Sequence, residues 1–319
     1  MRRNPYKIGK SGGLSPRFMQ RFGRFFTLKG PDGRWLRIVI GAAAAILGVV
    51  IAAAALRPET QLMNSVEIRR IESKGILSVA VRDDMPGFCE NGEGLEAELA
   101  RLIAQRILPD SEDPVKLVPC SSKTVSTKLA DGTVDIAIAL QPKGGSSSYS
   151  YSYPYYTDRV LLVTLAEANV TKDPSELRIG YIPETPAGKV FASYVSKVTA
   201  AAEQSMIDKL LRRPKPTPDP ETAVTIDSVK FGSFDELLQA LSRGQIDAAV
   251  MAGADHRKYF VIPTGEAATR WFLCDAVIGE LQYCMIASSD EPALMQIADM
   301  LIYEMQENGS LKELIGKYM

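Results

Sequence analysis

Short apolar runs alternate with segments of helical periodicity from about residue 66 onward, and this alternation is the strongest constraint on the fold. The runs 76–81, 115–118 and 134–140 have the length and composition of buried strands. Between them, 94–107 and 124–129 carry apolar side chains at helical spacing. A βαβαβ order of this kind predicts an α/β fold whose parallel strands are joined by right-handed crossovers.

A second α/β unit follows the first. Thr185 and Pro186 predict a helix start, with Thr as the N-cap and Pro in the first helical position. Alternate prolines predict an exposed loop over 213–221, since they exclude both a helix and a central strand. The other expected elements are strands at 159–165, 177–182, 228–231, 246–251 and 282–287, and helices at 200–211, 234–242 and twice within 291–319. The chain thus contains two similar units with two crossings between them.

Five of the twelve tyrosines lie between 149 and 156, directly after the third predicted strand and a Gly-Gly loop. In an extended chain, Tyr149, Tyr151, Tyr153 and Tyr155 would share one face, because side chains alternate along a strand. An aromatic face at the carboxyl end of a parallel strand predicts a small-ligand site. The alternative is that the rings only pack a crossover between domains.

The amino-terminal region differs in charge from the rest of the chain. Of 37 basic and 38 acidic residues, ten basic and one acidic residue lie in 1–37, which leaves 27 and 37 for the remainder, a net charge of about −10. Residues 38–56 carry no polar side chain and would span roughly 28 Å as a helix. We therefore expect a basic cytoplasmic tail (1–37), a transmembrane anchor in the lipid bilayer (38–56) and a linker (57–65).

The positive-inside rule then predicts a single-pass protein of the cell membrane, with its amino terminus in the cytoplasm and its carboxyl-terminal domain outside. A cleaved signal peptide is the alternative, with Ala53, Ala54 and Ala55 as the cleavage site. Phenylalanines among the cations of the tail favour lipid headgroups over nucleic acid, so no nucleic-acid partner is expected.

Four cysteines, Cys89, Cys120, Cys274 and Cys284, fall on the predicted outer side. Their even number and the lack of a Cys-x-x-Cys pair favour disulfides over a zinc site. The simplest pairing joins Cys89 to Cys120 and Cys274 to Cys284, and free buried thiols are the alternative. With His256 as its one histidine, the chain is poorly equipped for His-based metal or triad chemistry, and we expect neither a metal nor a cofactor.

Six motifs, in order, resemble the bacterial extracellular solute-binding proteins of family 3, the amino-acid receptors of ABC importers. Gly94 to Ala100 is similar to their Gly-Phe-Asp-x-Asp-Leu-Ala helix, and Tyr151 to Tyr156 to their Phe-Ser-x-Pro-Tyr-Tyr hinge entry. The other four lie at 74–88, 131–135, 244–248 and 309–318. The resemblance implies a two-lobed, type II periplasmic-binding-protein-like fold, with lobe 1 at 66–157 completed by 284–319 and lobe 2 at 158–283.

The chain departs from this family where its members hold an amino acid. The expected arginine after the third strand is missing from 141–151, where Lys143 is the only cation. The family's Gly-Thr-Thr element is Glu184-Thr185-Pro186, and the acid that holds the amino group maps onto Ala252, with Asp255 as the nearest candidate. These departures argue against an ordinary α-amino acid as the ligand.

The ligand is nevertheless expected between the two lobes. Phe88 or a tyrosine of 149–156 would stack on it, and Lys143 would replace the missing arginine as a point charge. Alternatively, Asp84 caps a turn, Phe88 belongs to the core, and Lys143 is a solvated loop residue. The candidate ligand contacts are Asp84, Phe88, Ser121, Ser122, Gln141, Lys143, Tyr153, Thr185 and Asp255.

The sequence therefore predicts a membrane-tethered extracytoplasmic binding protein, not an enzyme, that delivers a small polar ligand to an ABC permease. One alternative is a degenerate receptor-like domain that serves in sensing or protein contact. A second is an enzyme of the dehydratase type on the same fold, with Glu184 as its general acid.

Overall fold

A computed structural model describes residues 40, 62–144, 146–210, 225–260 and 271–319. The chain divides into two units, 1–61 and 62–319, and the second carries the described fold. The predicted anchor over 38–56 lies outside the described residues apart from Ile40. None of the helices in the described part of the chain is both long enough and apolar enough to cross a bilayer.

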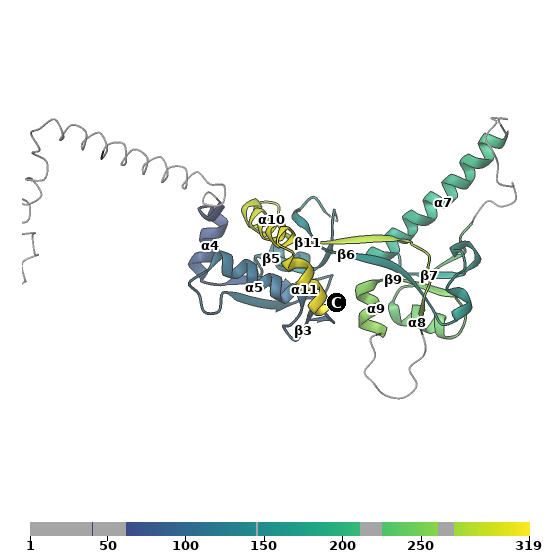
Figure 1. The fold of residues 1–319 in the computed structure, drawn as a ribbon, viewed down its shortest axis with the longest axis horizontal. Coiled ribbons are helices and arrows are strands. Elements are labelled where there is room, and N and C mark those ends of the chain that lie inside the picture. Colours follow the sequence, from purple (N-terminus) through teal and green to yellow (C-terminus); the bar gives the residue numbers. More distant parts are fainter. Residues whose placement is uncertain (1–39, 41–61, 145, 211–224, 261–270) are drawn as a thin grey trace, which may run out of the picture. The chain divides into compact units, whose positions relative to one another are not determined.

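Apart from the hairpin of β2 and β3, the described strands of the second unit form one mixed sheet in the order β4-β1-β5-β11-β6-β9-β7-β8, with β10 paired to β6. Figure 1 shows the long strands β6 and β11 side by side. The first strand group, β4, β1 and β5, is parallel, and so is the second strand group, β9, β7 and β8. Between the two groups, β11 and β6 are antiparallel to their neighbours. The strands are β1 (Leu77–Val81), β4 (Val115–Pro119), β5 (Ile136–Pro142), β6 (Tyr149–Thr164), β7 (Ile179–Tyr181), β8 (Ser228–Lys230), β9 (Ala248–Ala252), β10 (Phe272–Leu273) and β11 (Gly279–Ser288).

This mixed α/β fold is consistent with the two-lobed prediction, because two parallel α/β groups are joined by long crossing strands. The exact lobe boundaries at 157 and 283 stay a prediction. The helices are α4 (Val66–Lys74), α5 (Leu95–Ile107), α6 (Val125–Ala130), α7 (Pro186–Leu210), α8 (Phe234–Ser242), α9 (Gly253–Phe260), α10 (Pro292–Glu307) and α11 (Ser310–Tyr318). Short 3-10 turns lie at Glu167–Asn169 and Pro174–Glu176, and a small hairpin joins β2 (Asp84–Met85) to β3 (Cys89–Glu90).

The helix ends follow the capping signals of the sequence. Ser65 caps α4, where its hydroxyl accepts a hydrogen bond from the amide of Ile68, and Gly75 ends that helix in the left-handed conformation. Thr185 caps α7 as expected, since its hydroxyl accepts a hydrogen bond from the amide of Gly188 at 3.0 Å. The separate helix expected at 200–211 is instead the continuation of α7, which runs unbroken to Leu210.

The predicted shared face of the four tyrosines is wrong. The strand expected at 159–165 merges with the tyrosine run into the single strand β6, whose pairing with β11 shifts register twice between Tyr156 and Tyr151. Extra residues at such bulges interrupt the alternation of faces. As a result Tyr153 is 56% exposed, whereas Tyr155 is 1% exposed and packs in the core.

The predicted disulfides are not found, because all four cysteines are free thiols. Cys274 lies opposite Leu162 of β6, and Cys284 pairs with Pro154, eight residues earlier on the same strand. Eight residues of extended strand cover roughly 26 Å, whereas bridged cysteines have Cα atoms within about 7 Å of each other. The thiols of Cys89 and Cys120 are directed at different acceptors, the Asp83 carboxylate and the Val81 carbonyl.

Candidate functional site

A cavity of about 240 Å³ opens between the carboxyl ends of β1 and β5 on one side and the starts of α7, α8 and α9 on the other. The carboxyl ends of parallel strands are where open α/β sheets bind ligands. Residues from both strand groups line the cavity, together with β11: Arg82, Met85, Ser122, Leu140, Thr185, Pro186, Phe234, Ala252, Ala254, Asp255, Lys258, Tyr259 and Tyr283.

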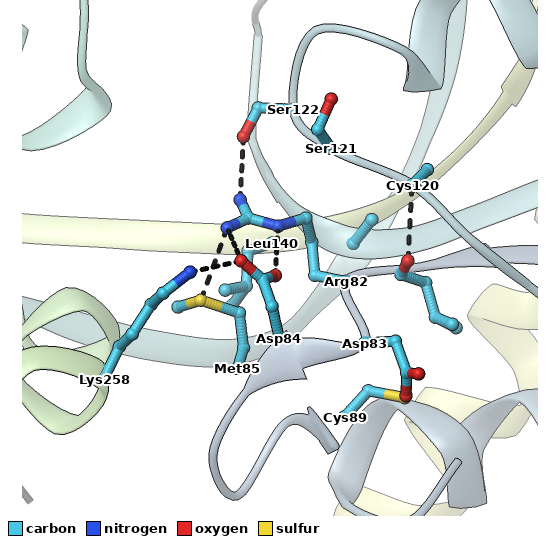
Figure 2. Close-up of polar contacts among 12 residues, drawn as sticks. Arg82, Asp83, Asp84, Met85, Cys89, Cys120, Ser121, Ser122, Leu140 and Lys258 are labelled. Atoms are coloured by element: carbon cyan, nitrogen blue, oxygen red, sulfur yellow. Dashed lines mark hydrogen bonds and ion pairs between the residues drawn. The ribbon is translucent and has the colours of Figure 1, made fainter. Parts of the chain in front are cut away.

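Two cations converge on one carboxylate at this cavity (Figure 2). Arg82, directly after β1, donates from Nε to Oδ1 of Asp84 at 2.9 Å and from Nη2 to Oδ2 at 3.2 Å. Its Nη1 donates to the hydroxyl of Ser122 at 2.7 Å. From the other side of the cavity, Lys258 of α9 forms an ion pair with Oδ2 of Asp84.

These contacts decide the protonation state of Asp84. Partial burial would raise the pKa of this carboxyl, but the hydrogen bonds and charges of Arg82 and Lys258 prevail and lower it to about 2. Asp84 is therefore ionised at all physiological pH values. It links the loop after β1 to α9 through two ion pairs, and we call Arg82, Asp84 and Lys258 together the charge cluster.

Asp158 determines where α9 begins, and with it the position of Lys258. The carboxylate of Asp158 accepts a hydrogen bond from the amide of Ala254 at 2.8 Å. A Cβ atom at Gly253 would lie 2.3 Å from Oδ1 of Asp158, so any other residue would displace this carboxylate. The first turn of α9 then places Asp255 in the cavity wall.

Asp255 is the acid of the cavity wall. Burial raises its pKa to about 6, the charge of Asp158 adds to this effect, and the charges of Arg82 and Lys258 oppose it. Its carboxylate remains mostly ionised at neutral pH. A buried carboxylate of this kind would be stabilised by a ligand cation beside it.

Aromatic rings form much of the remaining wall. The rings of Phe234 and Tyr259 have centroids 4.9 Å apart. Behind the wall, Phe88 is fully buried and packs edge-on against Tyr156 and Tyr283, with centroids 5.2 and 6.3 Å away. Phe88 is thus a core residue, as the alternative interpretation held, and does not line the cavity.

A buried carboxyl lies directly behind Leu140 of the cavity wall. Oε1 of Glu96 accepts hydrogen bonds from the amide of Leu140 at 2.8 Å and from the hydroxyl of Tyr155. Its Oε2 has no hydrogen-bond partner among the described residues. Burial raises the pKa of Glu96 to about 8, and neither the Tyr155 hydroxyl nor the charge of Arg82 offsets that effect.

The structure brings three of the nine predicted contacts into the cavity wall: Ser122, Thr185 and Asp255. Asp84 adjoins the wall through its two cations. It holds those cations rather than standing free as a turn cap.

The remaining predicted contacts lie elsewhere. Lys143 is exposed and does not line this cavity, and its role in place of the missing arginine stays a prediction. The amide of Gln141 donates to its neighbour Ala139, and Ser121 bonds Thr124 on the surface. Tyr153 is exposed on β6. Glu184, the acid of the dehydratase alternative, is also exposed and does not line the cavity.

Sequence reasoning missed the two cations of the site. Arg82 directly follows a predicted parallel strand, which was a usable signal, because such positions border ligand sites in α/β folds. Lys258 lies on α9, a helix that the sequence pattern did not reveal. Within the described residues, no group of three or more His, Cys, Asp or Glu side chains is placed to hold a metal ion.

Comparison with known proteins agrees with this fold. The family of bacterial extracellular solute-binding proteins, family 3, matches residues 77–319. A mutant of ArgBP from T. maritima is similar in structure, with 20% identity, 79% of this chain and 99% of that chain covered, and a TM-score of 0.53. So is the amino acid ABC transporter substrate-binding protein AbpA from Streptococcus pneumoniae, solved with L-arginine, at 20% identity, 78% and 97% coverage and a TM-score of 0.51.

A third similar structure is the ancestral amino acid-binding protein AncCDT-1, described as a precursor of cyclohexadienyl dehydratase. It is 17% identical, with 80% of this chain and 99% of that chain covered and a TM-score of 0.52. At such identities the likeness concerns the fold alone.

Proposed function

Because the chain belongs to the bacterial extracellular solute-binding proteins of family 3, we propose that it binds a small polar solute in the cavity between the two strand groups. One observation carries the proposal: Arg82, which follows β1, lines the same small cavity as Asp255 and Lys258 of α9. Convergent polar groups within an otherwise aromatic and apolar wall are typical of small-molecule sites. The protein binds and releases this solute without transforming it.

The crossing strands β6 and β11 provide a route for ligand-dependent closure. They connect the two strand groups, and the residues on either side of the cavity belong to different groups. Closure about such connections would bring both walls onto a ligand, as in other hinged binding proteins. The Lys258–Asp84 ion pair is the contact that such a motion would make and break.

Delivery to an ABC permease and attachment to the membrane complete the proposal. The structurally similar protein AbpA is described as an amino acid ABC transporter substrate-binding protein. The apolar residues 38–56 and the basic residues 1–37 support a retained anchor with the binding domain outside the cytoplasm. Fractionation of cells expressing the full chain tests the anchor: we expect the protein in carbonate-washed membranes, and a variant lacking 38–56 in the soluble fraction. Recovery of the full chain as a soluble protein would contradict it.

Ligand binding is tested by thermal unfolding of the full chain in detergent or nanodiscs against single amino acids, dicarboxylates, oligopeptides and polyamines. At a ligand concentration of 100 times Kd, binding stabilises the folded state by about 2.7 kcal/mol. Arg82→Gln should abolish the shift, whereas Lys116→Gln, an exposed lysine on β4, should leave it unchanged. The absence of stabilisation by every compound would overturn the proposal and favour a receptor-like domain without a ligand. Mass spectrometry of the recovered ligand should show it intact.

A further inference from the structure

Helix α9 reaches across to the opposite side of the cavity through two consecutive residues. Nη1 of Arg257 donates a hydrogen bond to the carbonyl oxygen of Met319, directly after α11, at 2.9 Å. Lys258 forms its ion pair with Asp84, in the hairpin that follows β1 (Figure 2). The partners in both contacts belong to the chain itself, so these contacts do not depend on a solute in the cavity.

The acceptors of these contacts are fixed to the first strand group. The hydroxyl of Tyr318 donates to Oε1 of Glu98 on α5 at 3.1 Å, and α5 lies between β1 and β4 in the chain. A Cβ atom at Gly87, where φ is +80°, would lie 2.7 Å from the carbonyl oxygen of Tyr318, so the hairpin loop packs closely against the end of α11. Met319 and Asp84 are therefore expected to move together with this group.

The donors are fixed to the second strand group. Helix α9 directly follows β9, and its first turn is held by the hydrogen bond from the Ala254 amide to Asp158. Arg257 and Lys258 lie about one turn further along the same helix. A rotation of one strand group relative to the other would therefore break both contacts together.

We propose that the Arg257–Met319 and Lys258–Asp84 contacts form a latch, which keeps the cavity closed in the ligand-free protein. The proposal goes beyond solute binding, because it concerns the protein before a solute arrives. The latch then determines what fraction of the molecules is open to a solute at any moment.

The charges at the cavity support closure without a ligand. Arg82 and Lys258 are its cations, and Asp84 and Asp255 are the acids beside them. Asp84 is ionised at neutral pH because its pKa is lowered to about 2, and Asp255, with a pKa of about 6, is mostly ionised as well. Among the described residues at the cavity, two cations are thus matched by two acids. Closure over these residues does not bury an unbalanced charge, which would be costly.

Single-molecule energy transfer between two dyes measures the opening of the cavity. Lys123 and Glu184 are exposed, and each lies next to a wall residue on a different side of the cavity, Ser122 or Thr185. The dyes are attached at positions 123 and 184 through unnatural amino acids, because the chain has native free thiols. The full chain is held in nanodiscs and freed of solute by dialysis, as checked by mass spectrometry. We expect most molecules to show the short distance of this structure.

Variants that remove one latch contact should open the cavity. Arg257→Gln removes a charged donor, and we expect the ratio of closed to open molecules to fall about tenfold. Asp84→Asn weakens a half-exposed ion pair and should lower the ratio by up to about fivefold. Arg243→Gln is the matched control, since this arginine is exposed at the end of α8 and outside the latch. Thermal unfolding shows whether each variant is folded, and Asp84→Asn provides the test if Arg257→Gln is not.

Three outcomes would overturn the latch: a ligand-free wild type in which most molecules show a longer distance, an unchanged distance distribution in the folded latch variants, or equal opening by Arg243→Gln. If such an open wild type closes when a compound from the panel is added, solute binding stands without the latch. Conversely, a closed wild type that binds no compound from the panel would support the latch and overturn the proposed function.

Discussion

Asp84 and Glu96 lie twelve residues apart in the chain, yet the pKa values of their carboxyl groups are shifted in opposite directions. The side chain of Asp84 is 49% exposed and contacts two cations, and its pKa is lowered to about 2. Glu96 is fully buried with only uncharged hydrogen-bond donors, and its pKa is raised to about 8. The comparison shows that nearby cations determine the pKa of Asp84 at the cavity rim, whereas the loss of hydration determines the pKa of Glu96 in the core.

The two carboxyl groups accordingly serve different parts of the site. The charge cluster lies at the rim of the cavity, where the side chain of Asp84 is half-exposed to water. Glu96 instead fastens the cavity wall, since its hydrogen bonds join α5 to Leu140 at the end of β5 and to Tyr155 on β6. Leu140 has a positive φ of 52°, a conformation that costs free energy and needs support from its surroundings.

The largest effect is expected from Glu96→Ala. Truncation leaves the Leu140 amide and the Tyr155 hydroxyl without a partner and opens a void, at a cost of about 2 to 5 kcal/mol in the free energy of unfolding. Glu96→Gln, the control, keeps an acceptor oxygen in the same place and should cost much less. Urea unfolding of both variants at pH 6 measures the difference. Equal stability of the two would show that Glu96 does not fasten the wall.

The pH dependence of stability tests the raised pKa of Glu96. Between the ordinary value of 4.5 and the folded value of about 8, the folded state holds a proton that the unfolded state has lost. Stability must therefore fall as the pH rises through this window, by up to about 1.4 kcal/mol per pH unit. Glu96→Gln cannot titrate and should lose this component of the slope. Identical slopes in urea unfolding from pH 5 to 8 would refute a neutral Glu96.

Tyr155→Phe tests the hydrogen bond that the hydroxyl on β6 donates to Glu96. Removing the hydroxyl deletes one hydrogen bond to Glu96 inside the core, and we expect a loss of about 1 kcal/mol. Tyr153→Phe is a matched control two residues earlier on β6, where the ring is exposed and the hydroxyl faces water. Thermal unfolding should separate the two variants. A larger loss from Tyr153→Phe would contradict the assigned packing of β6.

Asp84→Asn should have the smallest effect on stability, under about 1 kcal/mol, because water screens half-exposed ion pairs. Ionised Asp84 stabilises the folded state above its ordinary pKa of 3.8, and this contribution is lost as the pH falls towards 2. The variant should therefore show a flatter stability curve between pH 4 and 2, as measured by circular dichroism. Added salt should weaken the wild-type contribution. A loss of stability as large as that of Glu96→Ala would contradict the small contribution expected from the ion pairs of the half-exposed Asp84.

Most elements of the fold could be predicted because local signals define them. Ser65 and Gly75 delimit α4, and Thr185 with Pro186 starts α7, since capping depends on residues within one turn. The bulges of β6 could not be predicted, because they arise from its pairing with β11, more than 100 residues later.

The candidate site was predictable only in part for a related reason. Ser122, Thr185 and Asp255 follow or begin elements at the expected edge of the sheets, so their positions follow from the fold. Lys258 depends on α9, which starts where Asp158 of a distant strand accepts the amide of Ala254. Nothing in the residues around Lys258 reveals that contact.

By itself, the sequence determined the α/β class, much of the order of helices and strands and the family resemblance, because periodicity, caps and short motifs act over neighbouring residues. Only the tertiary structure decided which charges meet. The cysteines remain apart, Lys143 stays outside the cavity, and Arg82 and Lys258 line it. Electrostatic and packing interactions act through space, so the partners of each ionised side chain depend on how the strands and helices come together.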